Sequence, residues 1–391
     1  MNKAVHVHDV LIACMICAAV ACARVAAEPA APNVLFFITD DESAVERSAY
    51  GRSKLPTPAF DRVAKDGVLF TNGFTTAPSC APSRASVLTG RHFWELEQGG
   101  FIQAFIPRKY PTVSRILADH GYEIGRTGKG WGPGSHPTLG IPGDTLGRHF
   151  DRETIADPPQ GVHDTDYAGN FARFLETRDA AKPFFFWAGI MEPHEPSGRD
   201  SHLLLEKEFG IRPEDVLLPP FVEDTPRKRR ARANFLYEIC LADRHLASML
   251  ARLEERGLLE NTLVVVTADN GTAILDGSQE QRGKASPYDL GCHVPLAIMW
   301  PALLVAAALV KPVKEELYDL EKDPWQLDDR VADPALADER RRLAARLRQV
   351  GTERGDPRFT ADMDLFVKTR AYVQKRKRMG YTKTGGLPFD E

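Results

Sequence analysis

The sequence predicts an α/β fold with a mostly parallel central sheet flanked by helices. From Asn33 onward, short apolar stretches alternate with segments of helical periodicity, which is typical of this class. Val34–Thr39 and Leu263–Thr267 are solid apolar runs, as expected for strands that are covered on both faces. Polar residues follow both runs directly, where ligands gather in parallel sheets.

Length and composition limit the possibilities. A chain of 391 residues fits one large domain with a smaller appendage. With 43% apolar and 27% charged residues, it is close to ordinary globular proteins and can build a large core. The formal charge of -4 is small, so we expect neither a nucleic-acid partner nor attachment to an acidic membrane surface.

The first residues have the layout of a secretory signal. Lys3 precedes the apolar stretch Val10–Ala23, and Val25–Ala27 offers small residues before Glu28. The apolar stretch is shorter than the about 20 residues that a membrane span needs. We therefore expect a signal peptide over residues 1–27, a secreted or periplasmic protein, and no membrane span. The basic start and the small-residue exit argue against a buried N-terminal helix.

Removal of this segment would leave three cysteines, Cys80, Cys240 and Cys292. An odd and sparse set in an exported protein argues against a disulfide framework. At least one thiol therefore needs another explanation.

Further elements follow from periodicity and end signals. Two more apolar stretches are expected strands. Two segments are expected helices, the first because its apolar residues share one face and the second because a proline marks its first turn. They are the strands Tyr122–Thr127 and Phe184–Ala188, the helix Arg227–Arg256 before Gly257, and a charged helix from Pro334 to about Gln349. We expect the basic run at the start of the long helix to be a solvated face.

Polar residues at the ends of two strands suggest a metal site. Asp40 and Asp41 follow the first strand, and Asp269 and Asn270 follow the Leu263 strand. If they converge, three carboxylates and an amide form an all-oxygen cage, which suits calcium or magnesium and is poor for zinc. A single acidic pair of this kind is more often a turn or a helix cap, but two pairs at corresponding strand ends favour metal.

Cys80 begins a predicted helix. Pro82 suits a first turn and Gly90 suits the end of the helix. A helix N-terminus favours an anion, which would place Cys80 at an anion-binding position. Two alternatives remain at this point: a small buried cysteine, or a nucleophilic thiolate, for which the sequence shows no accompanying Cys–His arrangement.

The segment Cys80–Arg91 resembles the sulfatase signature C-x-P-S-R-x-x-x-L-T-G-R at every fixed position. The resemblance extends from Asn33 to about Pro301, with a second patch at Glu316–Trp325. It implies an alkaline phosphatase-like fold and the hydrolysis of sulfuric esters or sulfamates, on a sulfated sugar or glycan. It also implies that a separate maturation enzyme converts Cys80 to formylglycine, whose hydrate attacks sulfur.

The resemblance further implies roles for individual residues. The modified residue 80 would bind calcium, with magnesium as the alternative, together with Asp40, Asp41, Asp269 and Asn270. Arg84 would hold the hydrate, and Lys129 would lie near the nucleophile. His194 and Lys284 would contact sulfate oxygens and protonate the leaving group, as the charge of a sulfate ester requires. Outside their motifs, this histidine and these lysines would be ordinary surface or core residues.

The sequence departs from the family pattern in places. Trp131 stands where many relatives have a histidine, for which His136 could substitute, and His293 replaces a usual arginine. After Pro301 the chain passes through the alanine- and leucine-rich stretch 302–310 and soon reaches the second patch, which suggests an internal deletion. We therefore expect a catalytic domain over 28–301 and a small truncated C-terminal subdomain over 302–391, with a charged helix and a basic tail. An intact site on a weakened scaffold would result.

Two other functions remain open. Phosphate or phosphonate ester hydrolysis is possible within the same superfamily. The departure after Pro301 also allows a non-catalytic remnant that binds anionic glycans.

Overall fold

The computed structural model describes residues 31–132, 146–272, 282–301 and 337–353. Several sequence expectations lie outside these residues. They are the signal peptide, His136, the 302–310 junction, the 316–325 patch and the basic tail.

A seven-stranded sheet forms the centre of the fold, in the order β2-β7-β6-β1-β5-β3-β4. The strands are β1 (Asn33–Thr39), β2 (Val68–Leu69), β3 (Glu123–Gly128), β4 (Arg148–His149), β5 (Phe184–Gly189), β6 (Thr262–Ala268) and β7 (Leu296–Met299). β1 pairs in parallel with β5 and β6, and β3 pairs in parallel with β4 and β5. β7 is antiparallel to its neighbours β2 and β6. The expectation of a mostly parallel sheet is confirmed.

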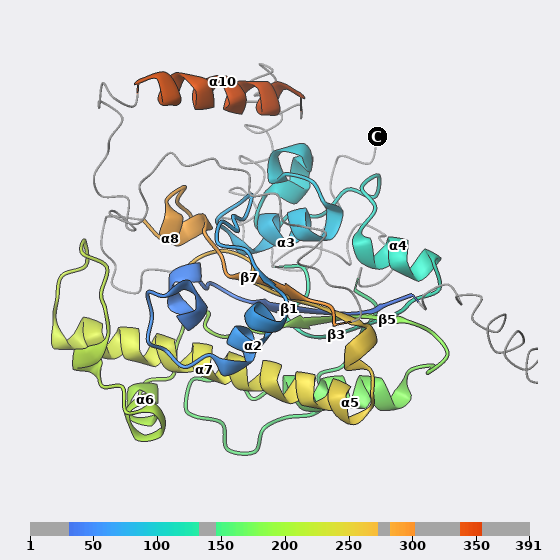
Figure 1. The fold of residues 1–391 in the computed structure, drawn as a ribbon, viewed down its shortest axis with the longest axis horizontal. Helices are drawn as coiled ribbons and strands as arrows, with labels where there is room; N and C mark the ends of the chain where they lie inside the picture. Colours follow the sequence, from blue (N-terminus) through green and yellow to red (C-terminus); the bar gives the residue numbers. More distant parts are fainter. Residues whose placement is uncertain (1–30, 133–145, 273–281, 302–336, 354–391) are drawn as a thin grey trace, which may run out of the picture. The chain divides into compact units, whose positions relative to one another are not determined.

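Helices cover both faces of the sheet (Figure 1). α2, α5 and α7 lie on one face, and α3 and α4 lie on the other. α6 packs on the outer side of α7. The helices are α2 (Pro58–Asp66), α3 (Cys80–Thr89), α4 (Val113–Asp119), α5 (Tyr167–Thr177), α6 (Ser201–Phe209), α7 (Pro226–Glu255), α8 (Asp289–Cys292) and α10 (Ala337–Glu353).

The side chains of each strand point alternately to the two faces of the sheet. In β1, Leu35 and Phe37 face α2, α5 and α7, whereas Ile38 faces α3. Every residue of β5 is buried, because helices cover both sides of this strand. This burial explains why the run Phe184–Gly189 shows no alternation of polar and apolar residues.

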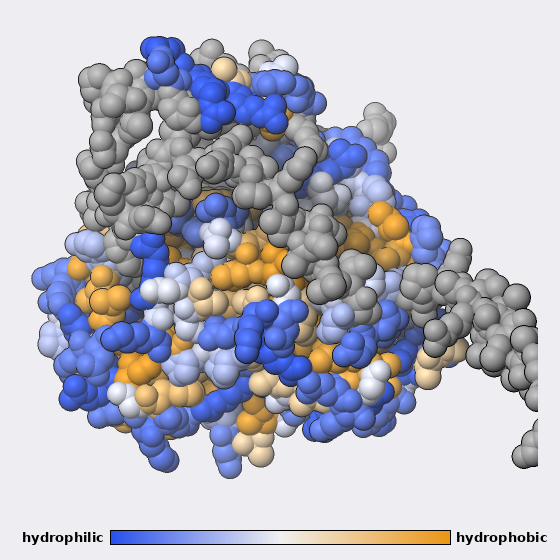
Figure 2. Space-filling model, in the orientation of Figure 1, coloured by the Kyte–Doolittle hydropathy of each residue, from blue (hydrophilic) through white to orange (hydrophobic). Residues whose placement is uncertain are grey.

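One region of the sheet is less well covered. Leu263, Val265, Leu296 and Ile298 of β6 and β7 are only half-buried. A groove of about 330 Å³ lies between these strands and α3, and Val87 contributes to its lining. In Figure 2, apolar side chains show in the middle of the view, over the strands, and hydrophilic ones predominate over the helices below. The groove contains none of the predicted catalytic residues.

The long helix α7 begins where its sequence signals place it. The side chain of Thr225 accepts a hydrogen bond from the backbone of Lys228, and Pro226 occupies the first turn. At this end, Lys228 pairs with Glu223 and Arg229 pairs with Asp224 on the surface. Among the helices that the structure describes, none has the length and apolar character needed to cross a bilayer.

Candidate active site

The turn after β1 brings two carboxylates to the carboxyl edge of the sheet. Asp40 and Asp41 follow Thr39, which is in register with Ala268 of the neighbouring strand. Asp41 has a left-handed backbone with φ of 68°, a conformation that aspartate tolerates better than most residues. Its N–H donates to Asp269 Oδ1 at 3.2 Å. The pairing of β1 with β6 therefore sets the two predicted ligand pairs side by side.

The turn after β6 completes this arrangement. Asn270 Nδ2 donates to Asp41 Oδ1 at 2.8 Å. Asp269 Oδ1 accepts from the Asn270 backbone at 2.7 Å, and Asp269 Oδ2 accepts from Arg84 Nε at 2.7 Å. Both oxygens of Asp269 thus already have protein donors, so this residue also fixes the two turns and the guanidinium.

Cys80 lies in the first turn of α3 and is 4% exposed. Its Sγ lies 3.4 Å from Asp40 Oδ1 and 3.9 Å from Asp41 Oδ1, and Lys284 Nζ donates to it at 3.0 Å. Burial, with further contributions from Asp269 and Asp40, raises the pKa of this thiol to about 12. The thiol is therefore protonated at neutral pH, which argues against an unmodified thiolate nucleophile.

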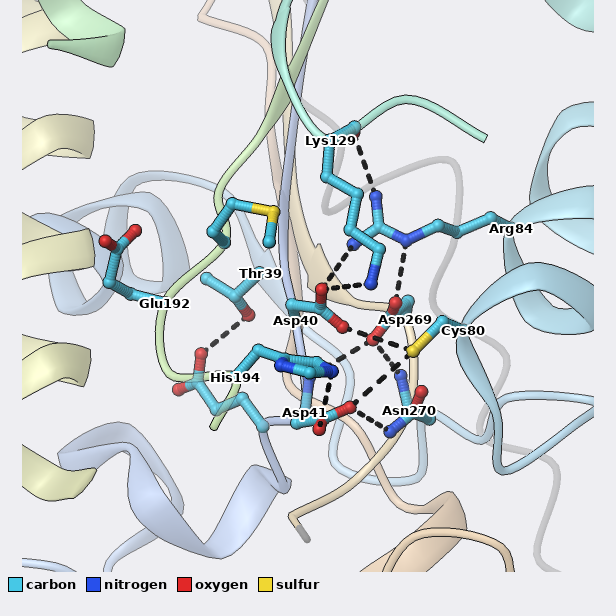
Figure 3. A network of polar contacts seen from close by, with 12 residues as sticks. Thr39, Asp40, Asp41, Cys80, Arg84, Lys129, Glu192, His194, Asp269 and Asn270 are labelled. Carbon is cyan, nitrogen blue, oxygen red and sulfur yellow. Dashed lines mark hydrogen bonds and ion pairs between the residues drawn. The ribbon is translucent and has the colours of Figure 1, made fainter. Parts of the chain in front are cut away.

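Three cations contact the carboxylates, and two of them, Arg84 and Lys129, are labelled in Figure 3. Arg84 is fully buried, and its Nη1 donates to the backbone oxygens of Lys129 and Gly130 at 3.1 and 3.2 Å. Lys129 forms an ion pair with Asp40 Oδ2, and Lys284 Nζ donates to both oxygens of Asp41 at 2.6 and 2.8 Å. Three carboxylates and three cations leave the cluster close to neutral, so a bound divalent cation would make it attractive to an anionic ester.

The cations determine the protonation of their partners. Burial by itself would raise the pKa of Asp40, but the charges of Arg84 and Lys129 outweigh it and lower this pKa. Burial by itself would lower the pKa of Lys284, but the neighbouring Asp41 and Cys80 outweigh it and raise this pKa above the ordinary lysine value. Asp40 is therefore ionised and Lys284 is an ammonium group at neutral pH.

His194 occupies the outer side of the cluster. Its Nε2 lies 3.8 Å from Asp41 Oδ2, and its Nδ1 lies 2.7 Å from the backbone oxygen of Glu195. Its side chain is 34% exposed, compared with 21% for Lys284, 12% for Lys129 and 0% for Arg84. Among the predicted catalytic residues other than Cys80, His194 is therefore the most accessible to the departing part of a substrate.

The donor atoms fit a hard metal ion. One ligand atom from each of Asp40, Asp41, Cys80 and His194 lies within 4.8 Å of the others. Asn270 Oδ1 is buried and accepts no hydrogen bond from the described residues. Carboxylate and amide oxygens are the ligands that calcium and magnesium prefer. A metal bound among these groups would also provide a partner for the orphaned amide oxygen.

Two described residues that depart from the family pattern, Trp131 and His293, are held by contacts within the fold. Trp131 is buried against the α3 side of the sheet, in the same cluster as Ile38 and Trp187. His293 is buried, with Nδ1 at 3.1 Å from Asp289 Oδ2 and Nε2 at 2.9 Å from the backbone oxygen of Thr71. These contacts give His293 a structural role in the described part of the chain.

The structure thus brings together all the predicted catalytic and metal-binding residues. Sequence reasoning missed the buried residues Tyr167, Glu192 and Glu238, which support the segment that carries His194. The one available signal was that Glu192 is close in sequence to His194. The supporting contacts themselves join distant residues, with Tyr167 25 residues from Glu192 and Glu238 40 residues from Gly198. Fold and site together define an α/β protein with a cluster of carboxylates and cations at the carboxyl edge of its sheet, where a metal ion and an anion could bind.

Comparison with known proteins identifies the family. The family model named Sulfatase matches residues 32–321. An ulvan-active sulfatase of Formosa agariphila is 30% identical over 282 residues, which cover 70% of this chain and 49% of that protein. The chain belongs to the sulfatase family. It spans about half the length of this curated relative.

Solved structures show the same fold. A 2-O GAG sulfatase has a TM-score of 0.61 at 17% identity, covering 84% of this chain and 94% of its own. The phosphonate monoester hydrolase of Silicibacter pomeroyi has a TM-score of 0.52 at 21% identity, covering 70% and 69%. At these identities the likeness concerns the fold, which is alkaline phosphatase-like as expected.

Proposed function

We propose that this protein hydrolyses sulfuric esters or sulfamates of a sulfated sugar or glycan, with residue 80 acting as formylglycine. The main support is the position of Cys80, at the N-terminus of α3 and within contact of Asp40, Asp41 and Lys284. The proposed nucleophile, metal ligands and anion-binding cations would therefore meet at one point. Family membership and the complete Cys80–Arg91 signature support the same reaction.

The residues divide the work as follows. The hydrated aldehyde at residue 80 would supply a hydroxyl nucleophile, and calcium, or magnesium as the alternative, would supply positive charge next to it. Asp40, Asp41, Asp269 and Asn270 would hold the metal. Lys129 and Lys284 would bind sulfate oxygens, and Arg84 would keep the carboxylates and the nucleophile in place. Charge that develops on the sulfate thus meets cations that are already in position.

His194 would protonate the leaving oxygen or nitrogen. An imidazole readily gives up a proton near neutral pH, whereas the raised pKa of Lys284 makes that group a poor acid. The greater exposure of His194 also places it on the side where the leaving sugar would lie. Lys284 is better suited to charge stabilisation than to proton transfer.

The similar proteins point to a glycan as the substrate. The Formosa relative is described as ulvan-active, and the structural neighbour is described as a 2-O GAG sulfatase. The proposal includes export through residues 1–27, maturation of Cys80 by a formylglycine-generating enzyme, and a catalytic domain over residues 28–301. Residues 302–391 would form the shortened C-terminal region.

Phosphate or phosphonate ester hydrolysis is the second candidate. The observation that favours it is the shared fold of a phosphonate monoester hydrolase. A cluster of cations and a metal would bind tetrahedral phosphorus and sulfur anions by the same interactions. The ratio of kcat/KM for 4-nitrophenyl sulfate to that for 4-nitrophenyl phosphate separates the two. A ratio well below one would replace the sulfatase proposal with the phosphatase one.

Two further measurements test the proposal. Peptide mass spectrometry around Cys80, after co-expression with a maturation enzyme, should show the aldehyde, and Cys80→Ala should abolish turnover without lowering the melting temperature in metal-free buffer. Calcium at 100 times its Kd should stabilise the fold by about 2.7 kcal/mol, and Asp269→Ala should weaken this effect. Unmodified Cys80 with full activity would refute the mechanism. Absence of both turnover and a calcium shift would indicate a non-catalytic remnant.

A further inference from the structure

His194 is carried by a segment without helix or strand, residues 190–198, which we name the His194 loop. The loop leaves the end of β5, where Ile190 N donates to Ile38 O at 2.9 Å. Within the loop, His194 N donates to Met191 O at 2.9 Å. Because regular secondary structure does not fix this segment, contacts with other elements set the distance between His194 and the Cys80 cluster.

Tyr167, at the start of α5, provides such a side chain. It is 0% exposed, and its hydroxyl donates to Glu192 Oε2 at 3.0 Å and accepts from Met191 N at 3.1 Å. The other oxygen of Glu192 accepts from His163 N at 3.3 Å. One hydroxyl therefore holds two consecutive residues of the His194 loop.

Glu192 also connects the loop to the metal-binding turn. Its backbone oxygen accepts from Asp40 N at 3.3 Å. Its side chain is buried and, in Figure 3, points away from the Cys80 cluster. A shift of Glu192 would thus change the position of His194 relative to Asp40.

The far end of the loop has its own support. Glu238 of α7, 2% exposed, accepts from Gly198 N through Oε1 at 2.7 Å. Tyr167 and Glu238 come from two helices of the same layer and hold the two ends of the loop. Both groups are buried, and their hydrogen bonds go to the His194 loop, so they would act on a substrate only through this loop.

We propose that Tyr167 is a positioning residue which, with Glu238 at the other end of the loop, sets the reach of His194 toward the leaving group. The inference rests on the proposed function, in which His194 protonates that group. A general acid must lie within about 3 Å of the atom that it protonates, and a misplacement of about 1 Å can cost 100-fold in rate. Loss of the Tyr167 hydroxyl should therefore impair protonation of the leaving group more than attack on sulfur.

Leaving-group dependence tests this inference. 4-Nitrophenolate departs without help from an acid, whereas phenolate benefits from protonation. For Tyr167→Phe we expect kcat/KM to fall about tenfold for phenyl sulfate and less than about threefold for 4-nitrophenyl sulfate. Glu238→Leu should also lower the ratio of kcat/KM for phenyl sulfate to kcat/KM for 4-nitrophenyl sulfate, and His194→Ala should lower this ratio further.

Tyr237→Phe is the matched control. Tyr237 is also a buried tyrosine, and it donates to a glutamate, Glu208, at 3.0 Å between α7 and α6. Its loss should leave the ratio of the two substrates unchanged. Equal losses on both substrates in Tyr167→Phe, or no loss, would overturn the positioning role. If the wild type hydrolyses neither these two sulfates nor a sulfated glycan, the proposed function fails, and the positioning role of Tyr167 fails with it.

Hydrogen exchange tests the support of the loop without turnover. The Met191 amide should exchange faster in Tyr167→Phe than in the wild type, because this variant removes its acceptor. Tyr237→Phe should leave that exchange unchanged. Unaltered exchange at Met191 in Tyr167→Phe would show that the hydroxyl does not hold the loop.

Discussion

At the scale of single residues, a buried ion network stands directly behind the metal-binding turn. Arg47, fully buried, donates to Glu42 Oε2 at 2.9 Å and to Asp243 Oδ1 at 3.0 Å. Glu42 follows Asp40 and Asp41, and it also accepts from the Thr39 hydroxyl at 2.7 Å. One guanidinium therefore pairs with two buried carboxylates next to the site.

Asp243 extends this network to α2. Its oxygens accept from the backbone N–H groups of Ala59 and Phe60 at 2.9 and 3.0 Å. Burial raises the pKa of Asp243 despite the opposing charge of Arg47. The cost of burying this carboxylate is thus only partly compensated, and it would grow without the arginine.

We predict that Arg47→Met destabilises the protein by about 3–5 kcal/mol, because it leaves two buried carboxylates without their cation. Urea unfolding at neutral pH measures this loss. The control is Arg173→Met, which removes an exposed arginine paired with Glu176 at 3.3 Å and should change stability by less than about 0.5 kcal/mol. Similar losses in the two variants would show that the buried network does not stabilise the fold.

At the scale of elements, the sequence identified those whose signals are local. The predicted strands that became β1, β5 and β6 end within one residue of their expected positions, as do α3 and α7. Their signals are unbroken apolar runs, a first-turn proline and a closing glycine. All of these lie within a few residues of the element that they define.

Other elements lack such signals. β2 has two residues and β7 has four, and β7 is antiparallel although its sequence resembles that of any short strand. The direction of a strand depends on its partners and not on its own residues. The site residues differ in the same way. Asp40 and Asp269 can be predicted because they directly follow strands, whereas the contact of Tyr167 with Glu192 depends on tertiary packing.

Two glycines with the same backbone conformation should respond differently to alanine. Gly90 ends α3 with φ of 65° and has open space where a Cβ would lie. Gly128, with φ of 64°, would place a Cβ at 2.2 Å from the backbone oxygen of Gly189. We predict a loss of about 1 kcal/mol for Gly90→Ala and a larger loss for Gly128→Ala, which must also displace β5.

Urea unfolding compares these two variants, and activity should separate them again. Gly128 directly precedes Lys129, whose ammonium pairs with Asp40. Gly128→Ala should therefore reduce turnover as well as stability, whereas Gly90→Ala should retain most activity. Equal stability losses would show that the close approach of β3 to β5 can relax.

At the scale of the whole molecule, two groups of α7 make stability depend on pH in opposite directions. Burial lowers the pKa of His245 from 6.5 to about 4. The ring of His245 packs edge-on against that of Tyr167, with 5.0 Å between the ring centroids. Burial raises the pKa of Glu238 from 4.5 to about 8. The folded protein thus binds fewer protons at His245 and more protons at Glu238 than the unfolded chain.

The signs follow from these shifts. His245 is neutral in both states above pH 6.5, and as the pH falls from 6.5 to about 4 the unfolded chain gains a proton that the folded protein does not. Stability should decrease over this window by at most about 3.5 kcal/mol, because each tenfold change in proton affinity is worth about 1.4 kcal/mol. The stabilisation from Glu238 is complete below pH 4.5 and is lost as the pH rises to about 8.

We therefore predict that His245→Gln makes unfolding by urea less sensitive to acid between pH 6.5 and 4, while Glu238→Gln reduces the loss of stability between pH 4.5 and 8. Glutamine is neutral at every pH, so each substitution removes one titration, and at position 238 an oxygen remains to accept from Gly198. Unfolding midpoints at half-unit pH steps, in buffers of constant ionic strength, measure both effects. His120→Gln is the control, because this histidine is exposed and its loss should leave the pH profile unchanged. A profile for His245→Gln that parallels the wild type from pH 6.5 to 4 would show that His245 is not held neutral by the fold.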